Sequence, residues 1–357
     1  MRKVLLRFVF DNLWQWQAVG NELHVGAAWL MLLWVAIVGV AFGVMYATSK
    51  KAAESAMSAG FWLIVPAALG AAWFLKLPIV KTGIPVFGYG MMMFVGFSTA
   101  TWLASRRVRA IGQPPEAIWD MMMWALIPGL IGARTIYLLQ NWNKIFSGKQ
   151  GTDLLLAAFA LWDGGIVFYG SVIGGIIGVV VYCRRRGINP LAMLDIIAPS
   201  MFVGEGFGRI GCFLYGCCYG RACDLPWAVR FPPDSLTFEK LAPEGRIIEN
   251  PLSTISLHPT QLYSSFAAFA LAGILAWYFR RRPFDGAVLA LGCIIYPINR
   301  FVLESLRDDE PTRWDTPFTF SQLISIGLLI SGIGAMYYFS TRGKLTGVSG
   351  STSRKIR

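Results

Sequence analysis

The sequence predicts an all-α polytopic membrane protein with about nine transmembrane helices. Its 357 residues are 55% hydrophobic and only 15% charged, and the mean hydropathy is +0.53. These values are too apolar for a soluble domain of this size. A helix needs roughly 20 apolar residues to span about 30 Å of hydrocarbon, and nine stretches of the chain approach that length.

Two of these stretches lie in the N-terminal 80 residues. In residues 1–20, apolar side chains alternate loosely with polar ones, so we expect an interfacial amphipathic helix there. The first two spans are predicted over 25–47 and 60–77, separated by a polar, alanine-rich segment at 48–59. We expect residues 1–80 to form an extension that is separate from the rest of the chain.

Residues 81–342 are predicted to form a core of seven spans. Most loops in this part are short and rich in glycine, but several prolines and mixed charge at 215–260 indicate a sizeable extramembrane segment. A basic tail follows at 343–357. The seven spans are predicted over residues 84–104, 117–139, 165–183, 191–207, 261–279, 286–303 and 319–340.

The basic residues predict how the chain is oriented. The formal net charge is +12, but the arginines and lysines lie in short loops and the tail, not on one soluble face, which argues against a nucleic-acid partner. Every second loop is basic, and the positive-inside rule places such loops in the cytoplasm. Segments 140–162, 208–260 and 304–318 then lie at the outer face with the N-terminus, and we expect the chemistry there.

Two arginines lie in or beside apolar spans, where a charge is costly and usually functional. Arg209 follows Glu205 by four residues and Arg307 follows Glu304 by three, so each arginine shares a helix face with a carboxylate. Arg300 adds a guanidinium one turn before Glu304. One interpretation is two ion pairs that lock the fold. The other is that Arg209 and Arg307 converge on a phosphate, which their planar donor forks suit.

Tyr169 and His258 are the candidate proton acceptors. Tyr169 lies in the run DGGIVFYGSVIGG at 163–175, whose glycines favour close helix packing. Its phenol could donate to a phosphate or take part in proton transfer. His258 opens the motif HPTQLY, where it serves either as a loop hydrogen-bonding group or as a base. We expect Gln261 and Tyr263 to project near it.

Four of the six cysteines fall within 12 residues: Cys212, Cys217, Cys218 and Cys223. Their spacing matches no common zinc or redox motif. The first interpretation is that these cysteines form a disulfide or serve as small buried side chains, because an outer-face location permits a disulfide. Metal binding and a catalytic thiol are the alternatives.

Several motifs, taken together, resemble the prolipoprotein diacylglyceryl transferase family. The signature is GRIGCFLYGCCYG at 208–220. The other matches occur in the family's order: GYG at 88–90, GARTIY at 132–137, DGGIVFYG at 163–170, DIIAP at 195–199, HPTQLY at 258–263 and ESLRDDE at 304–310. The resemblance runs from about residue 84 to 340 and implies a seven-span transferase core.

The resemblance implies roles for particular residues. Arg209 and Arg307 correspond to the family's essential arginines, and we expect them to be catalytic together with Tyr169 or His258. The expected substrate-binding residues are Tyr89, Arg134, Asp195, Glu205, Gln261, Tyr263, Glu304 and the signature glycines Gly208, Gly211, Gly216 and Gly220.

Four positions depart from the family's pattern. Cys212 and Cys217 stand where the family usually has asparagine and glutamate, and Tyr215 stands where asparagine or a similar residue is usual. Tyr169 stands where many members have a histidine proposed as the base. The chain therefore resembles a cysteine-bearing variant, and a base at position 169 cannot be an imidazole.

The resemblance also implies a reaction and a location. The diacylglyceryl group of phosphatidylglycerol would pass to the lipobox cysteine of a preprolipoprotein, which forms a thioether and releases glycerol 1-phosphate. We expect no metal and no cofactor. The expected partners are phosphatidylglycerol, signal peptides with a lipobox and the lipid bilayer. The expected location is the bacterial cytoplasmic (inner) membrane, with the active site facing the outer leaflet.

Three other functions fit the same residues. A transporter or binding protein for an anionic lipid would also bury arginines, but would release its ligand unchanged. A membrane thiol oxidoreductase would use Cys217 and Cys218 with a quinone. A non-catalytic lipid-binding homologue would keep the fold without turnover. Formation of a thioether product separates the transferase from all three.

Overall fold

The computed structural model describes residues 4–9, 14, 16–19, 22–33, 35, 36, 39, 84–146, 167–249, 252–308 and 317–342. The predicted span at 60–77 and the basic tail lie outside these residues, as does nearly half of the predicted span at 25–47. The chain divides into two compact units. The first unit comprises Met1–Phe94 and Gly208–Leu262, and the second comprises Val95–Phe207 and Tyr263–Arg357.

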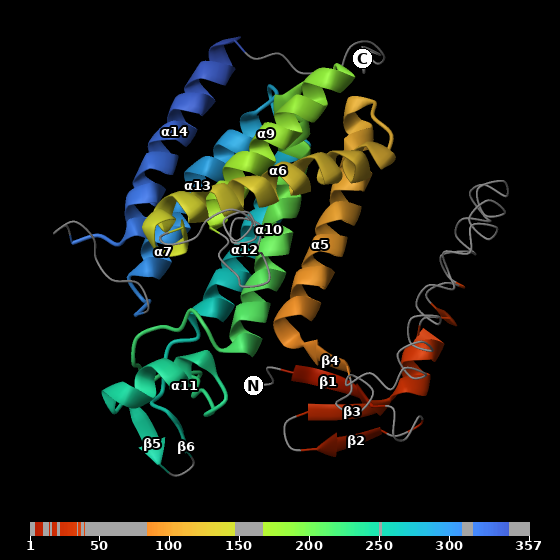
Figure 1. Cartoon of the computed structure of the whole chain (residues 1–357). Coiled ribbons are helices and arrows are strands. Elements are labelled where there is room, and N and C mark those ends of the chain that lie inside the picture. The colour runs from red at the N-terminus through yellow and green to blue at the C-terminus, as the bar shows by residue number, and fades with distance from the viewer. Residues whose placement is uncertain are drawn as a thin grey trace, which may run out of the picture. The chain divides into compact units, whose positions relative to one another are not determined.

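Seven long helices coincide with the seven predicted core spans (Figure 1). Each forms over a run of mainly apolar residues. A helix satisfies its backbone hydrogen bonds within itself, which apolar surroundings require. They are α5 (Gly88–Arg107), α6 (Glu116–Gln140), α9 (Phe168–Arg186), α10 (Pro190–Tyr215), α12 (Thr260–Phe279), α13 (Ala287–Glu304) and α14 (Phe320–Arg342). Shorter helices are η2 (Val108–Ile111) and α7 (Trp142–Phe146).

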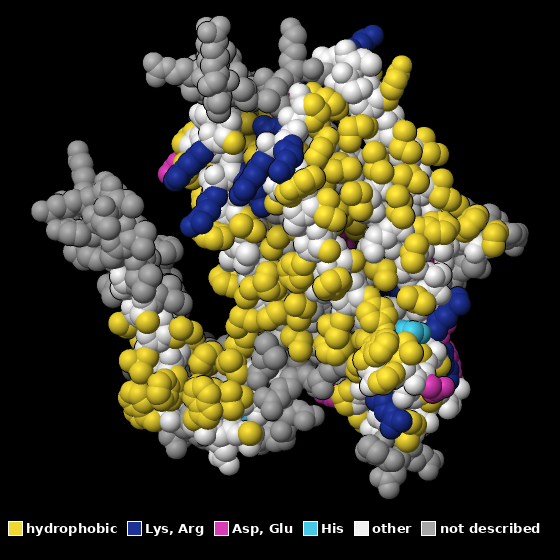
Figure 2. All heavy atoms as spheres, turned by 180° about the vertical axis from the view of Figure 1, so that it is seen from behind, with side chains coloured by type: hydrophobic (Ala, Val, Ile, Leu, Met, Phe, Trp, Pro, Cys, Tyr) yellow, Lys and Arg dark blue, Asp and Glu magenta, His cyan; other side chains and the backbone are white. Residues whose placement is uncertain are grey.

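Five helices among the described residues are long and apolar enough to cross a membrane, namely α6, α10, α12, α13 and α14. The helix α9 is shorter in its apolar part because it ends in three arginines. Large hydrophobic side chains are widely exposed, including Phe266 at 78% and Phe94 at 69%. Figure 2 shows such side chains spread over a helical surface, with Lys and Arg gathered apart from them. The chain is a multi-pass membrane protein, and the predicted total of nine spans stays a prediction.

Within the second unit, α6 and α9 lie side by side along a stripe of small residues (Figure 1). A Cβ atom on Gly170, Gly174 or Gly178 of α9 would overlap a backbone carbonyl of α6. These three glycines recur every four residues, so they form one face of the helix. Their missing side chains let the two backbones approach closely. The packing interpretation of this glycine-rich run is therefore confirmed for Gly170 and Gly174.

A buried carboxylate fixes the start of α13 in the second unit. Asp195 of α10 is fully buried, and its two oxygens accept hydrogen bonds from the backbone nitrogens of Gly286 and Leu289, each at 2.9 Å. These are amide groups that a helix start leaves without intrahelical partners. The Arg282 Nε lies 3.7 Å from an Asp195 oxygen and balances part of its charge. Asp195 thus has a structural role in this helix junction.

The first unit contains a four-stranded sheet where the sequence predicted an interfacial helix. Its strands are β1 (Val4–Val9), β2 (Trp16–Val19), β3 (Glu22–Gly26) and β4 (Ile84–Phe87), in the order β2-β3-β1-β4. Strand β1 pairs parallel with β3 and antiparallel with β4. The helix prediction for residues 1–20 was wrong.

The reason lies in the length of the apolar run. Strand β1 reads VLLRFV, a short apolar run that is interrupted only by Arg7, and a run of this length favours a strand over a helix. Strands β2 and β3 pair antiparallel and are separated by two residues, Gly-Asn in the sequence, which is a hairpin signal. Arg7 of β1 donates a 2.7 Å hydrogen bond to Glu22 of β3 and ties the parallel pair.

The segment after α10 folds into a small subdomain of the first unit. It contains α11 (Leu236–Leu241), η4 (Ala242–Glu244) and the antiparallel strands β5 (Ile247–Glu249) and β6 (Leu252–Thr254). Its core is a cluster of four buried side chains, Tyr219, Phe231, Leu241 and Leu257. This subdomain supports the loop that carries the signature cysteines.

Candidate active site

The signature glycines of the first unit are sites of close packing. A Cβ on Gly211 would come within 3.1 Å of the Tyr89 ring, so this glycine lets α10 lie against the start of α5. A Cβ on Gly220 would come within 2.7 Å of His258. Gly216 has φ +74°, which glycine adopts without strain, and ends α10. Gly208 is less crowded, because its nearest neighbour is the Met93 sulfur at 3.6 Å.

The motif HPTQ at the start of α12 holds the signature loop in place. The backbone nitrogen of Gly220 donates to the His258 carbonyl at 3.2 Å. Thr260 Oγ1 donates to the Cys218 carbonyl at 2.8 Å, and Gln261 Nε2 donates to the Cys217 carbonyl at 2.6 Å. The motif and the signature therefore form one hydrogen-bonded structure, although they lie some forty residues apart in the chain.

Gln261 has capacity for a further contact. The residue is 1% exposed, and among the described residues its Oε1 atom has no hydrogen-bond partner. Leaving such an acceptor buried and unpaired costs about 1–3 kcal/mol. The amide is thus oriented by the Cys217 carbonyl on one side and can accept a hydrogen bond from a ligand on the other.

Two further predicted residues belong to the first unit: Tyr89, which lies beside the signature, and Arg209, which is part of it. The rings of Tyr89 and Tyr215 are 6.3 Å apart and tilted by 58°. Arg209 lies on α10, three residues before Cys212 and therefore on the same helix face. Glu205 lies one turn earlier on α10, as predicted.

The second unit brings Glu304 and two arginines together. Arg300 Nη2 lies 2.9 Å from Glu304 Oε2, and Arg307 Nε lies 3.8 Å from the same oxygen. All three side chains are largely buried, with exposures of 14% for Arg300, 9% for Arg307 and 1% for Glu304. Two guanidinium groups therefore lie close to one buried carboxylate. The planar donor fork of a guanidinium suits an anion such as a phosphate.

This trio extends the predicted pairing of Glu304 with Arg307. Arg300 was noted in the sequence but was not among the predicted site residues. Its spacing of four residues from Glu304 is the signal that identifies it, because residues four apart are neighbours on a helix. Arg300 also donates to Ser321 Oγ at 3.1 Å, which ties α13 to the start of α14.

Arg134 and Tyr169 flank the close contact between α6 and α9 in the second unit. The Arg134 guanidinium lies 5.2 Å from the centre of the Tyr137 ring, one turn further along α6. The Tyr169 ring contacts Phe320 edge-on with ring centres 5.7 Å apart, and the tyrosine is 37% exposed. Tyr263 begins the second unit's part of α12. The convergence of Arg209 and Arg307 stays a prediction, because the two arginines belong to different units.

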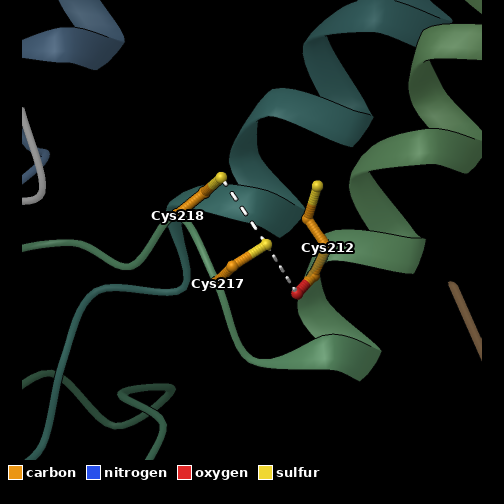
Figure 3. A group of neighbouring side chains, drawn as sticks. All are labelled: Cys212, Cys217 and Cys218. Carbon is orange, nitrogen blue, oxygen red and sulfur yellow. Dashed lines mark hydrogen bonds between the residues drawn. The ribbon is translucent and has the colours of Figure 1, made fainter. Parts of the chain in front are cut away.

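Three of the signature cysteines form a cluster, which Figure 3 shows. The sulfur atoms of Cys212, Cys217 and Cys218 all lie within 4.8 Å of one another. The Cys217 and Cys218 sulfurs are 3.7 Å apart, too far for a disulfide bond, which is about 2.05 Å long. No disulfide joins any of the six cysteines, all of which the structure describes. Interaction with Cys212 and Cys218, together with burial, raises the pKa of the Cys217 thiol.

The comparisons with known proteins agree with the motifs. Residues 78–338 match the model of a family described as prolipoprotein diacylglyceryl transferase. A phosphatidylglycerol–prolipoprotein diacylglyceryl transferase of Clostridium tetani is 37% identical over 251 residues, which are 70% of this chain and 92% of that protein. A second, from Clostridium perfringens, is 34% identical over 70% of this chain and 90% of its own length. The chain belongs to the prolipoprotein diacylglyceryl transferase family.

Proposed function

We propose that this protein transfers the diacylglyceryl group of phosphatidylglycerol to a cysteine thiol of prolipoproteins. The relatives from Clostridium carry this activity in their names and align with most of the chain. The observation in the structure that best supports it is the largely buried trio of Arg300, Glu304 and Arg307, which brings two guanidinium groups together. Guanidinium groups bind phosphate through two parallel hydrogen bonds.

In the proposed reaction, negative charge develops on the phosphate that leaves. The cysteine sulfur of the substrate forms a bond to the terminal glyceryl carbon, and the bond from that carbon to the phosphate oxygen breaks. The electron pair leaves with the oxygen, so glycerol 1-phosphate gains one negative charge. Arg209 and Arg307 are the residues proposed to stabilise that charge, which is greater in the transition state than in the bound lipid.

The thiol must lose its proton before or during the attack. Tyr169 and His258 are the proposed acceptors, Tyr169 from α9 and His258 from the motif that holds the signature loop. Gln261 is proposed as a positioning group for the substrate, because its buried Oε1 can accept a hydrogen bond. The other proposed substrate contacts are Tyr89, Arg134, Glu205, Tyr263 and the signature glycines.

The proposed setting follows from the charge pattern of the loops. We place the protein in the cytoplasmic (inner) membrane of a bacterium, with basic loops inside and the signature toward the outer leaflet. The lipobox segment of a signal peptide would enter from the bilayer. Residues 81–342 are proposed as the transferase core, and the match of the family model to residues 78–338 supports this division. Residues 1–80 are proposed as an added N-terminal part.

The test is transfer by the purified full chain in detergent, supplied with phosphatidylglycerol and a peptide that carries a lipobox cysteine. Mass spectrometry should detect a peptide that has gained one diacylglyceryl group through a thioether. Arg281→Ala is the matched control for variants of the buried arginines, because Arg281 is exposed and rests on the Trp277 ring. Folded protein that binds the lipid but forms no thioether would contradict the proposal and favour a transporter or binding protein.

A further inference from the structure

The cysteine cluster has the geometry of a metal site. In a tetrahedral site with Zn–S bonds of about 2.3 Å, sulfur ligands are about 3.8 Å apart. The Cys217 and Cys218 sulfurs are 3.7 Å apart, so this pair already has the spacing that a bound ion requires. All three sulfurs lie within 4.8 Å of one another, so a shift of at most about 1 Å brings the third into range.

The backbone holds two neighbouring cysteines on the same side. Successive side chains of an extended segment point in opposite directions, which would separate the sulfurs of Cys217 and Cys218. Cys218 instead has φ 59°, and it is the one non-glycine residue with positive φ in the described part of the chain. Such a conformation costs roughly 1–3 kcal/mol and persists where surrounding contacts impose it, often at functional sites.

Hydrogen bonds, and not a disulfide, impose the conformation of the loop that carries Cys217 and Cys218. The backbone nitrogen of Cys217 donates to the Cys212 carbonyl at 3.1 Å, which fixes the loop against the end of α10. The carbonyls of Cys217 and Cys218 accept the hydrogen bonds from Gln261 and Thr260. The three sulfur atoms are therefore presented by a loop that is held at both carbonyls, and Figure 3 shows them between the end of α10 and this loop.

The donor set selects the kind of ion. Three sulfur ligands suit soft, thiophilic cations such as Zn²⁺ and not Mg²⁺ or Ca²⁺, which prefer oxygen. Three thiolates with a divalent ion carry a net charge of −1, and Arg209 lies one turn before Cys212 on the same face of α10 to offset it. Three protein ligands leave the fourth position of a tetrahedral ion open to water or to an external thiol.

We propose that Cys212, Cys217 and Cys218 form a binding site for a thiophilic cation, with Zn²⁺ as the ion used to test it. Binding displaces the thiol protons and forms three metal–sulfur bonds, with no change in oxidation state. The proposed transfer chemistry requires no metal, so the two proposals are tested separately.

Cobalt gives the most direct test, because Co²⁺ in a thiolate site absorbs by sulfur-to-metal charge transfer and Zn²⁺ displaces it. The full chain is purified in detergent without oxygen, reduced with a phosphine and stripped with a chelator before titration. We expect absorption that saturates at one Co²⁺ per chain and is abolished by Zn²⁺. Cys217→Ser should remove it. Cys223→Ser is the matched control and should keep it, because Cys223 lies outside the cluster.

A second measurement uses the unaltered protein and so does not depend on how the variants fold. Zn²⁺ should protect Cys212, Cys217 and Cys218 from maleimide labelling, and a chelator should restore their labelling, while Cys223 reacts equally in both states. Three accessible thiols without cobalt absorption would overturn the proposal, as would absorption unchanged in Cys217→Ser. A disulfide within the cluster, found in protein trapped with a thiol reagent during isolation, would overturn it too. Transferase activity is measured separately, so failure of one proposal does not affect the other.

Discussion

Replacing Arg307 should affect the transfer reaction more than replacing Arg300, although both arginines contact the same carboxylate. With an effective dielectric constant of about 20, the Coulomb attraction at 2.9 Å is about 6 kcal/mol for Arg300 and at 3.8 Å about 4 kcal/mol for Arg307. Glu304 therefore neutralises Arg300 first. Arg307 lies farther from this carboxylate than Arg300 does, so it is the better candidate to bind the phosphate.

The magnitudes follow from these two roles. Removing one donor that stabilises transition-state charge typically lowers the rate by about 10²–10³-fold, and we expect a loss of that size in kcat/KM for Arg307→Ala. Arg307→Lys keeps the charge but loses the planar fork, so it should be impaired less than the alanine variant. Arg300→Ala should instead lower stability, because removing one partner of a buried ion pair costs about 3–5 kcal/mol.

The assay measures kcat/KM for a lipobox peptide with phosphatidylglycerol, alongside the midpoint of thermal unfolding of each variant. Arg281→Ala provides the exposed control. Arg307→Ala with unchanged kcat/KM would refute the assignment of Arg307 to the phosphate. Equal losses of activity in Arg300→Ala and Arg307→Ala, with both variants folded, would show that the difference between the two distances has no functional meaning.

Three more predictions concern packing, the signature loop and pH. Gly174→Ala should lower the thermal midpoint, because its Cβ overlaps a carbonyl of α6, with an overpacking cost of about 1–3 kcal/mol; Gly175→Ala is the control, since its nearest neighbour is 3.8 Å away. Gln261→Leu should lower both activity and stability, because it removes both the Nε2 donor to the Cys217 carbonyl and the Oε1 acceptor, whereas Gln261→Asn keeps an amide and should lose less of each. The Arg7 guanidinium lowers the pKa of Glu22, so this pair stabilises the sheet fully above the ordinary carboxyl pKa of 4.5 and loses its effect as pH falls through the lower folded value. Hydrogen exchange of the sheet amides, corrected for intrinsic rates, should follow that loss, and Glu22→Gln should remove the dependence.

The helices of the core were predictable because length and apolarity determine them locally. The runs that become α6 and α13 begin and end within a few residues of the predicted spans. The stripe at Gly170 and Gly174 was predictable for a similar reason, since small residues at helical spacing indicate close packing. The pairing of Glu304 with Arg307 also followed from their spacing, although α13 ends at Glu304 and Arg307 lies just beyond it, and only the part played by Arg300 was underestimated.

The sheet and the cysteine cluster depend on information that is not local. The short apolar run of β1 was mistaken for part of an amphipathic helix, because tryptophans and polar residues follow it within residues 1–20. Its partner β4 lies more than seventy residues further along the chain, and no periodicity reveals that pairing. The cluster depends on the positive φ of Cys218 and on hydrogen bonds from Gln261 and Thr260. The spacing of the cysteines matched no metal motif, because the fold of the loop, and not their spacing, brings the three sulfur atoms together.

The pairing of β1 with β4 also constrains the topology of the protein. Two hydrogen-bonded strands occupy the same compartment, so Val4–Val9 and Ile84–Phe87 lie on one side of the membrane. A chain that leaves a compartment and returns must cross the bilayer an even number of times. The two spans predicted between these strands satisfy that parity, and a single span would not. The strand pair therefore acts as a marker of sidedness, which labelling of an introduced cysteine beside each strand in intact cells can read.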